Sequence, residues 1–264
     1  MEQQIGGKIF NRNGNSFSLT YLGRRYVEHA NQVLSLNQTW EKELLDIKGS
    51  KIGELNIAFP LMRSSCIVPQ IMDQFYKRYP EITLNFLEEA YAIQEKLLLD
   101  DKIDFAVFNE TALNPKLEFE TLANEEILLL IPDHHPAKEK AVSSPNHRHL
   151  WMDLNFVKDE PFILHFPEQT TGRIALQLFD QYNIHPLVRI HTRSAETAVK
   201  LCSHGHGLCF VPESYIKNME LHHKPAAFSV GESGVYSKLI LAYKKGTYLT
   251  SYAREFISII KQSL

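Results

Sequence analysis

Residues 53–89 decide the fold, and they read GELNIAFPLMRSSCIVPQIMDQFYKRYPEITLNFLEE. The apolar stretch 55–59 predicts a buried strand, and residues 66–78 predict a helix with its apolar positions on one face. The alternating stretch 82–87 predicts a second strand. A strand, a helix and a strand in this order are typical of a parallel sheet that is covered by helices.

The same alternation continues along the chain on both sides of a proline-rich break at 132–136 and a polar loop at 137–149. We therefore expect an α/β protein with two lobes and a hinge near the break. The expected strands are 103–108, 119–122, 127–131, 161–166, 187–192, 208–211 and 238–243, and the expected helices are 91–99, 171–182, 195–203, 213–217 and 248–261.

The composition limits the class of protein. The chain has 264 residues, of which 44% are hydrophobic and 22% are charged, which is ordinary for a globular protein. The sequence has no apolar run long enough for a membrane span and no secretory signal at its start. Three cysteines are too few for a disulfide framework, so we expect a reducing compartment, the cytoplasm, and no membrane partner.

The net charge is −3, but residues 1–25 are basic. That stretch contains four basic residues, Lys8, Arg12, Arg24 and Arg25, but only one acidic residue, Glu2. A basic tip on an acidic body indicates contacts with DNA phosphates. Four charges in 25 residues are equally typical of a solvated surface, so charge alone leaves both interpretations open.

Residues 21–48 predict one long helix. Tyr26, Val33, Trp40 and Ile47 recur every seven residues, as in the seam of a coiled coil. A helix of about 28 residues is about 42 Å long, so its apolar stripe needs a partner. A second copy of the chain is the natural partner, which predicts a homodimer or tetramer; packing within the chain is the alternative.

Three segments carry a resemblance to a known family. Residues 53–89, 95–107 and 204–214 resemble the effector domain of LysR-type transcriptional regulators. The stretch from Glu2 to Gly23 resembles the end of the family's winged helix-turn-helix and the start of its linker helix. The resemblance implies a two-lobed effector domain, similar to periplasmic binding proteins, preceded by a winged-helix remnant and a long linker helix.

The resemblance also implies a division of the chain. We expect a wing remnant at 1–20, a linker and dimerisation helix at 21–48, lobe I at 49–136 and 224–264, and lobe II at 137–223. In the family a recognition helix precedes the wing, and Met1 falls at its end. We therefore expect promoter DNA as a partner only if the preceding segment is present, and no sequence-specific readout by the chain as written.

Polar turns mark where a ligand would bind. Open α/β sheets bind ligands at the carboxyl ends of their strands, and the turns 63–65, 169–171 and 193–194 follow strands and start helices. Free N–H groups and hydroxyls at helix starts suit a small carboxylate effector, and the family's effectors commonly bind in the same place. The predicted ligand-binding residues are Ser64, Ser65, Thr170, Thr171, Arg193, Ser194 and His206. The alternative is that the serines and threonines are only helix caps.

Other functions find little support in the sequence. It contains none of the common hydrolase, nucleotide-binding or zinc-protease motifs, so we expect no catalytic residues, no cofactor and no metal site. Cys66, at the expected helix start, should have a lowered thiol pKa, whereas Cys202 and Cys209 should be core residues. The main alternative to a regulator is a free-standing solute-binding protein with the same two lobes, and a small enzyme on this fold is a weaker one.

Overall fold

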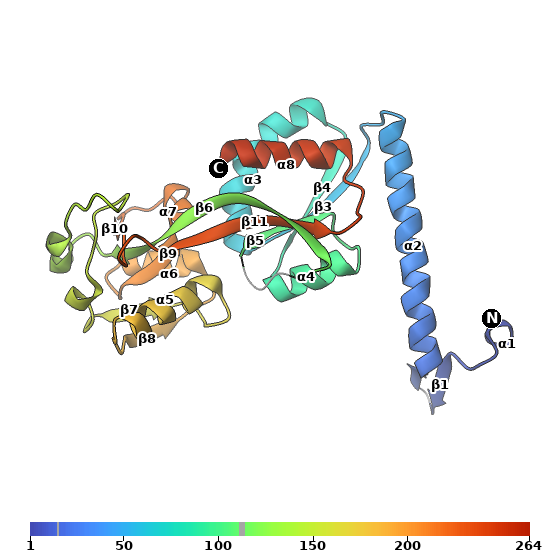
Figure 1. Cartoon of the computed structure of the whole chain (residues 1–264), viewed down its shortest axis with the longest axis horizontal. Helices are drawn as coiled ribbons and strands as arrows, with labels where there is room; N and C mark the ends of the chain where they lie inside the picture. Colours follow the sequence, from blue (N-terminus) through green and yellow to red (C-terminus); the bar gives the residue numbers. More distant parts are fainter. Residues whose placement is uncertain (15, 111–113) are drawn as a thin grey trace.

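The computed structural model describes residues 1–14, 16–110 and 114–264. Figure 1 shows a small hairpin, one long helix and two α/β lobes along the length of the molecule. The two-lobed α/β architecture predicted from the sequence is confirmed.

The N-terminal part is a hairpin followed by the long helix. After the short helix α1 (Glu2–Ile5), β1 (Phe10–Asn13) pairs with the antiparallel strand β2 (Ser16–Leu19). Thr20 then caps α2 (Tyr21–Ile47) by accepting a hydrogen bond from Gly23 N at 2.9 Å. A Cβ on Gly23 would lie 2.0 Å from the Ile9 carbonyl oxygen, so only glycine lets the hairpin pack this closely on the helix.

Among the described residues, no helix has both the length and the apolar character that crossing a membrane requires.

Lobe I is built on a mixed sheet. Three of its strands are parallel, with β3 between β4 and β5, and β11 lies antiparallel between β5 and β6 (Leu117–Ile131). Phe75, Phe105 and Phe256 pack together in its core. The elements of this lobe are β3 (Gly53–Phe59), α3 (Leu61–Arg78), β4 (Ile82–Glu88), α4 (Tyr91–Leu99), β5 (Phe105–Asn109), β11 (Tyr236–Lys244) and α8 (Ser251–Ser263).

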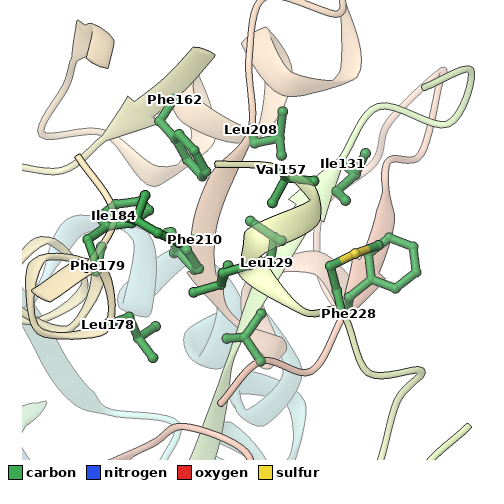
Figure 2. Close-up of a cluster of buried hydrophobic side chains, with 14 of the residues drawn as sticks. Leu129, Ile131, Val157, Phe162, Leu178, Phe179, Ile184, Leu208, Phe210 and Phe228 are labelled. Atoms are coloured by element: carbon green, nitrogen blue, oxygen red, sulfur yellow. The ribbon is translucent and has the colours of Figure 1, made fainter. Parts of the chain in front are cut away.

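Lobe II has a second core of its own. Figure 2 shows part of it, in which Phe162, Phe179 and Phe210 pack together and Leu208 belongs to the same cluster. Here β7 pairs with β8, and β9 and β10 pair with the end of β6. The elements are η1 (Pro136–Lys140), η2 (Leu154–Phe156), β7 (Pro161–Leu164), α5 (Thr170–Gln181), β8 (Leu187–His191), α6 (Ala195–Ser203), β9 (Cys209–Pro212), α7 (Glu213–Lys217) and β10 (Ala226–Phe228).

The strand β6 (Leu117–Ile131) belongs to both lobes. Residues 117–126 pair with β11 in lobe I, and residues 127–131 pair with β9 and β10 in lobe II. The prediction of two separate strands in this region is therefore wrong, because the polar residues 124–126 continue the pairing with β11 and the strand changes partners after Glu126 without ending. The chain passes between the lobes inside β6, not at the expected hinge 132–136, and residues 127–131 and 226–230 pack in lobe II.

Candidate functional site

The turns before α5 and α6 lie side by side in lobe II, as predicted. They follow the paired strands β7 and β8, and Thr192 N donates to Leu164 O at 3.0 Å. Gln169 Nε2 also donates to Arg193 O at 2.9 Å, which joins the two turns directly. The start of α5, with Thr170 and Thr171, is therefore next to Ser194 at the start of α6.

The start of α5 offers unused hydrogen-bond donors. Gln169 provides no side-chain cap, and the N–H groups of Thr170 and Thr171 donate to no acceptor within the described residues. At α6, by contrast, Ser194 Oγ already accepts from Thr197 N at 3.1 Å. A Cβ on Gly172 would lie 2.2 Å from the Phe166 carbonyl oxygen, so glycine is needed for α5 to begin against this turn. Unpaired N–H groups at a helix start favour an anion.

Arg193 already has partners. Its guanidinium lies 4.8 Å from the centre of the Phe166 ring and forms an ion pair with Glu168. Both charged side chains are more than half exposed, so this pair is held weakly. An anionic ligand would have to compete with Glu168 for the charge of Arg193.

In lobe I the helix α3 begins at Leu61, five residues before the predicted start at Cys66. Ser64 and Ser65 therefore lie inside its first turns, where Ser64 N donates to Pro60 O at 3.2 Å. The prediction of free N–H groups at 63–65 is wrong for this reason. The Ser64 hydroxyl donates to Glu88 Oε1 at 2.5 Å, and the exposed Ser65 hydroxyl donates to Met62 O at 3.0 Å.

The beginning of α3 faces lobe II. Met62 and Cys66 pack in the same apolar cluster as Ile190 and Ala195, which lie on either side of the turn before α6. The first turns of α3 and the start of α6 are thus on opposite sides of one junction between the lobes. Ser65, next to Cys66 in α3, and Ser194, next to Ala195 in α6, therefore adjoin the same junction between the lobes.

His206 lies apart from the turns before α5 and α6. It is exposed in the turn after α6, whereas Ser194 caps the other end of that nine-residue helix. The two ends are about 13 Å apart at 1.5 Å per residue. The neighbour of this turn is His134, since a Cβ on Gly205 would lie 3.1 Å from His134 Nε2.

His165, which follows the carboxyl end of β7, was not among the residues predicted from the sequence. It is only 5% exposed, and burial lowers its pKa to about 4, so the imidazole is neutral near pH 7. It stands beside Phe166 and directly before the turn that starts α5. A single polar residue ending the apolar stretch PFIL was the signal that pointed to it.

Arg63 was also missed, because a basic residue in a polar turn is typical of an exposed position. Its side chain is instead fully buried, and both terminal nitrogens donate to Glu125, at 2.8 and 2.7 Å. It donates further to Ser214 Oγ at 3.0 Å and lies 4.8 Å from the centre of the Tyr215 ring. Arg63 therefore connects α3, the interlobe part of β6 and α7.

The cysteines behave as core residues. Burial raises the pKa of the Cys66 thiol above its usual value, and the nearby Arg63 only partly offsets this effect. The prediction of a lowered pKa is wrong, because Cys66 lies inside α3 and not at its start. Cys202 and Cys209 are buried, as predicted. Within residues 1–14, 16–110 and 114–264 no group of three or more histidine, cysteine or acidic side chains is arranged to hold a metal ion.

The end of α2 is tied to lobe I by polar contacts. Asp46 accepts hydrogen bonds from the Tyr248 hydroxyl at 2.8 Å and from Ser251 N and Oγ at 2.9 and 2.5 Å. Lys42 Nζ forms an ion pair with Asp104 at 2.7 Å, and Asp104 also accepts from Asn56 N at 2.8 Å. These contacts fix the end of the long helix against the lobe that holds Ser64 and Ser65.

The four predicted phosphate contacts share the opposite end of α2. Lys8, Arg12, Arg24 and Arg25 are all exposed, on the hairpin and the first turns of the helix, at the end of the molecule away from lobe II (Figure 1). Among the described residues, Arg25 is the only one of the four that forms an ion pair with a carboxylate, that of Glu28 at 2.6 Å. The basic tip is therefore available to a negatively charged partner.

Sequence comparison identifies the family. The model of the LysR substrate binding domain matches residues 48–264. The chain belongs to the LysR family. This LysR-family chain is 24% identical to an uncharacterized HTH-type transcriptional regulator of Bacillus subtilis, YcgK, over 100% of its own length and 83% of the relative's. It is 26% identical to YnfL of Escherichia coli, another uncharacterized HTH-type transcriptional regulator, over 97% of its own length and 84% of the relative's.

Solved structures support the same fold. HinK, a LysR family transcriptional regulator from Pseudomonas aeruginosa, superposes with a TM-score of 0.68 and 20% identity over 100% of this chain and 85% of its own. The effector binding domain of QuiR in complex with shikimate gives a TM-score of 0.65 and 20% identity over 80% of this chain and 97% of its own. The regulatory domain of Synechocystis CcmR in complex with 2-PG gives 0.68 and 15%, with the same coverage. The chain is thus a LysR-family regulator with an effector-binding domain, and the family decides against a free-standing solute-binding protein.

Proposed function

We propose that this LysR-family regulator senses a small carboxylate in the cleft between its two lobes. The observation that carries the proposal is the start of α5, where Thr170 N and Thr171 N have no acceptor in the described part of the chain. A carboxylate there gains charge-assisted hydrogen bonds and the positive end of the helix dipole. The relatives QuiR and CcmR, which share the fold, have been solved with shikimate and 2-PG.

Each proposed residue has a role that follows from its position. Thr170 and Thr171 donate from their backbone and hydroxyl groups, Ser194 contributes from α6, and Ser65 contributes from lobe I. Ser64 is left out because it is buried and its hydroxyl already donates to Glu88. Arg193 supplies positive charge once it leaves Glu168. His206 is left out because it lies at the far end of α6. A ligand held from both lobes favours one arrangement of the lobes, and this is how it would control the regulator.

We further propose a homodimer or tetramer built through α2. Val33 is 68% exposed, Trp40 is 53% exposed and Ile47 is 65% exposed, all at seven-residue spacing on this helix. Within the described part of one chain these side chains stay exposed, and a second α2 would bury them. The polar contacts of Asp46 and Lys42 would then carry a movement of lobe I into the dimer helices.

The basic tip completes the proposal. We propose that Lys8, Arg12, Arg24 and Arg25 contact DNA phosphates in the dimer, an action that needs no enzymatic chemistry and takes place in the cytoplasm. Contacts with phosphates position a protein on DNA but do not read the base sequence of the DNA. The affinity contributed by these four residues should therefore fall steeply as the salt concentration rises.

Calorimetry with shikimate, benzoate and other small carboxylates tests the effector site. A ligand that binds the wild type should not bind Ser65→Trp or Thr171→Trp, because the indole would fill the cleft. The matched control is Ser143→Trp, since Ser143 is exposed on a loop of lobe II outside the cleft. If a carboxylate binds both cleft variants as tightly as the wild type, the proposed site is excluded.

A further inference from the structure

The turn between β4 and α4 carries two adjacent carboxylates, those of Glu88 and Glu89. The strands β3 and β4 are parallel and pair Phe59 with Glu88, so their carboxyl ends lie at one edge of the lobe I sheet. Glu89 N donates to Phe59 O at 2.9 Å, which holds the turn at that edge. In open α/β sheets this is the edge at which ligands bind.

This acidic turn adjoins the junction between the lobes. Glu88 Oε1 accepts a hydrogen bond from the Ser64 hydroxyl at 2.5 Å, and the helix α3, which carries Ser64, packs against lobe II through Met62 and Cys66. In Figure 1, α4 of lobe I and α5 of lobe II both lie on the lower side of the molecule, one on either side of the junction. The acidic turn is therefore on the lobe I side of the proposed effector cleft, and the start of α5 is on the lobe II side.

The two carboxylates of this turn have no basic partner. Other acidic side chains of lobe I are paired, as Asp104 and Glu110 are with lysines at 2.7 and 3.3 Å. Within residues 1–14, 16–110 and 114–264, neither Glu88 nor Glu89 forms an ion pair. The positive end of the α4 dipole favours negative charge at this position. The wall of lobe I therefore attracts a cationic group.

A buried acceptor lies beneath the same turn. Gln94 of α4 is fully buried, and its Nε2 donates to Glu89 O at 2.6 Å. Its Oε1 has no hydrogen-bond partner in the described part of the chain. Buried polar groups without a partner are rare in proteins, so this amide independently indicates that the turn lacks a donor. A ligand ammonium, with its three N–H groups, is a donor of the required charge.

The wall of lobe II has the opposite character. The start of α5 presents the N–H groups of Thr170 and Thr171, which donate to no acceptor among the described residues, and the positive end of a twelve-residue helix. A plain carboxylate complements this wall but is repelled by the acidic turn across the junction. A ligand with a carboxylate at one end and an ammonium at the other complements both walls.

We propose that the effector is a zwitterionic amino acid, whose carboxylate binds at the start of α5 and whose ammonium binds at Glu88 and Glu89. This inference rests on the proposed function, since it names the class of ligand that the same cleft takes. An amino acid makes both sets of contacts only when the lobes approach each other. It therefore favours the closed arrangement of the lobes through its higher affinity for that arrangement, whereas a plain carboxylate gains contacts from lobe II alone.

Calorimetry on the full chain tests the inference with matched pairs of ligands. The probes are the standard amino acids, β-alanine and 4-aminobutyrate, and each one that binds is compared with the acid in which a methyl group replaces the ammonium. Alanine is thus paired with isobutyrate, and 4-aminobutyrate with pentanoate. At least one amino acid should bind, roughly tenfold or more tightly than its methyl counterpart, because the counterpart offers no donor to the acidic turn.

The double substitution Glu88→Gln, Glu89→Gln should remove this preference, so that the two members of a pair bind within about twofold of each other. The plain acid should bind this variant more tightly than the wild type, because a repulsive charge is gone. Glutamine keeps an acceptor oxygen for the Ser64 hydroxyl. The matched control is Glu81→Gln, since Glu81 is exposed directly before the other end of β4, and it should keep the preference of the wild type.

Three results would overturn the inference. They are that no amino acid binds at millimolar concentration, that a methyl counterpart binds as tightly as its amino acid, and that the preference survives the double substitution. The proposed cleft is judged separately, by the cleft variants. A plain carboxylate that binds the wild type but not Thr171→Trp would support the cleft even where the amino acid is refuted, whereas an amino acid that binds Thr171→Trp as tightly as the wild type would contradict both proposals.

Discussion

Replacing Glu125 by glutamine should destabilise the protein strongly. The substitution keeps the size of the side chain but removes the charge that balances Arg63, whose side chain has no exposed surface. Breaking a buried ion pair by removing one partner costs about 3–5 kcal/mol, because the other charge stays buried without compensation. Glutamine retains one acceptor oxygen, so the lower end of this range, about 3 kcal/mol, is expected.

The effect can be measured by thermal unfolding followed by circular dichroism. For a chain of this size about 3 kcal/mol corresponds to a fall in Tm of roughly 6–12 °C. The matched control is Glu255→Gln, which breaks the ion pair with Arg78, a side chain that is 66% exposed, and should cost less than about 1 kcal/mol. The double variant Arg63→Met, Glu125→Leu should recover stability relative to Glu125→Gln, because it leaves no buried charge. A Glu125→Gln protein as stable as the Glu255→Gln control would refute the reasoning.

Three further predictions concern the linker helix, the cleft and the dimer. Burial raises the pKa of Asp46, but hydrogen bonds from Ser251 and Tyr248 lower it below its usual value of 3.8. The stability that Asp46 contributes is therefore present above about pH 4 and lost as the pH falls further, and Asp46→Asn should remove this dependence from melts recorded between pH 3 and 6. Burial lowers the pKa of His165 to about 4, below the 6.5 of the unfolded chain. The wild type should thus lose up to about 3 kcal/mol as the pH falls from 6.5 to 4, and a His165→Phe protein with the same loss would contradict this account. Val33→Asp should shift the chain toward monomer in sedimentation velocity, since it places a charge in the proposed seam, whereas Gln38→Asp, at an exposed position of the same helix, should not.

The sequence predicted the elements whose pattern is local. The helix α2 was expected over 21–48 and spans Tyr21–Ile47, because its seven-residue repeat and its Thr20 cap both lie within it. The strands β3 and β4 were predicted for the same reason, since their apolar runs are bounded by turns. The sequence predicted two strands where the structure has the single strand β6. This prediction failed because strand pairing depends on residues about a hundred positions away, in β9 and β11.

Only part of the arrangement around the proposed site followed from the sequence. The turns before α5 and α6 come together because parallel strands place their carboxyl ends at one edge. The start of α3 was misplaced because Pro60, which fits the position before a helix, begins it earlier than the serines do. Arg63 had no signal in the sequence, since only the fold brings Glu125, Ser214 and Tyr215 around it.

The path of β6 through both lobes has a consequence for synthesis on the ribosome. The elements of lobe II lie in one continuous stretch, from the end of β6 to β10, so this lobe has all of its strands once that stretch has emerged. Lobe I begins earlier in the sequence, but it is complete only when its last two elements have been synthesised. These are β11, which inserts between β5 and β6, and α8, which packs on α3. The N-terminal half of lobe I must therefore remain unfinished while lobe II forms. Translation that stops before Tyr236 would yield a chain with a complete second lobe and an open first sheet, the exposed edge of which favours aggregation.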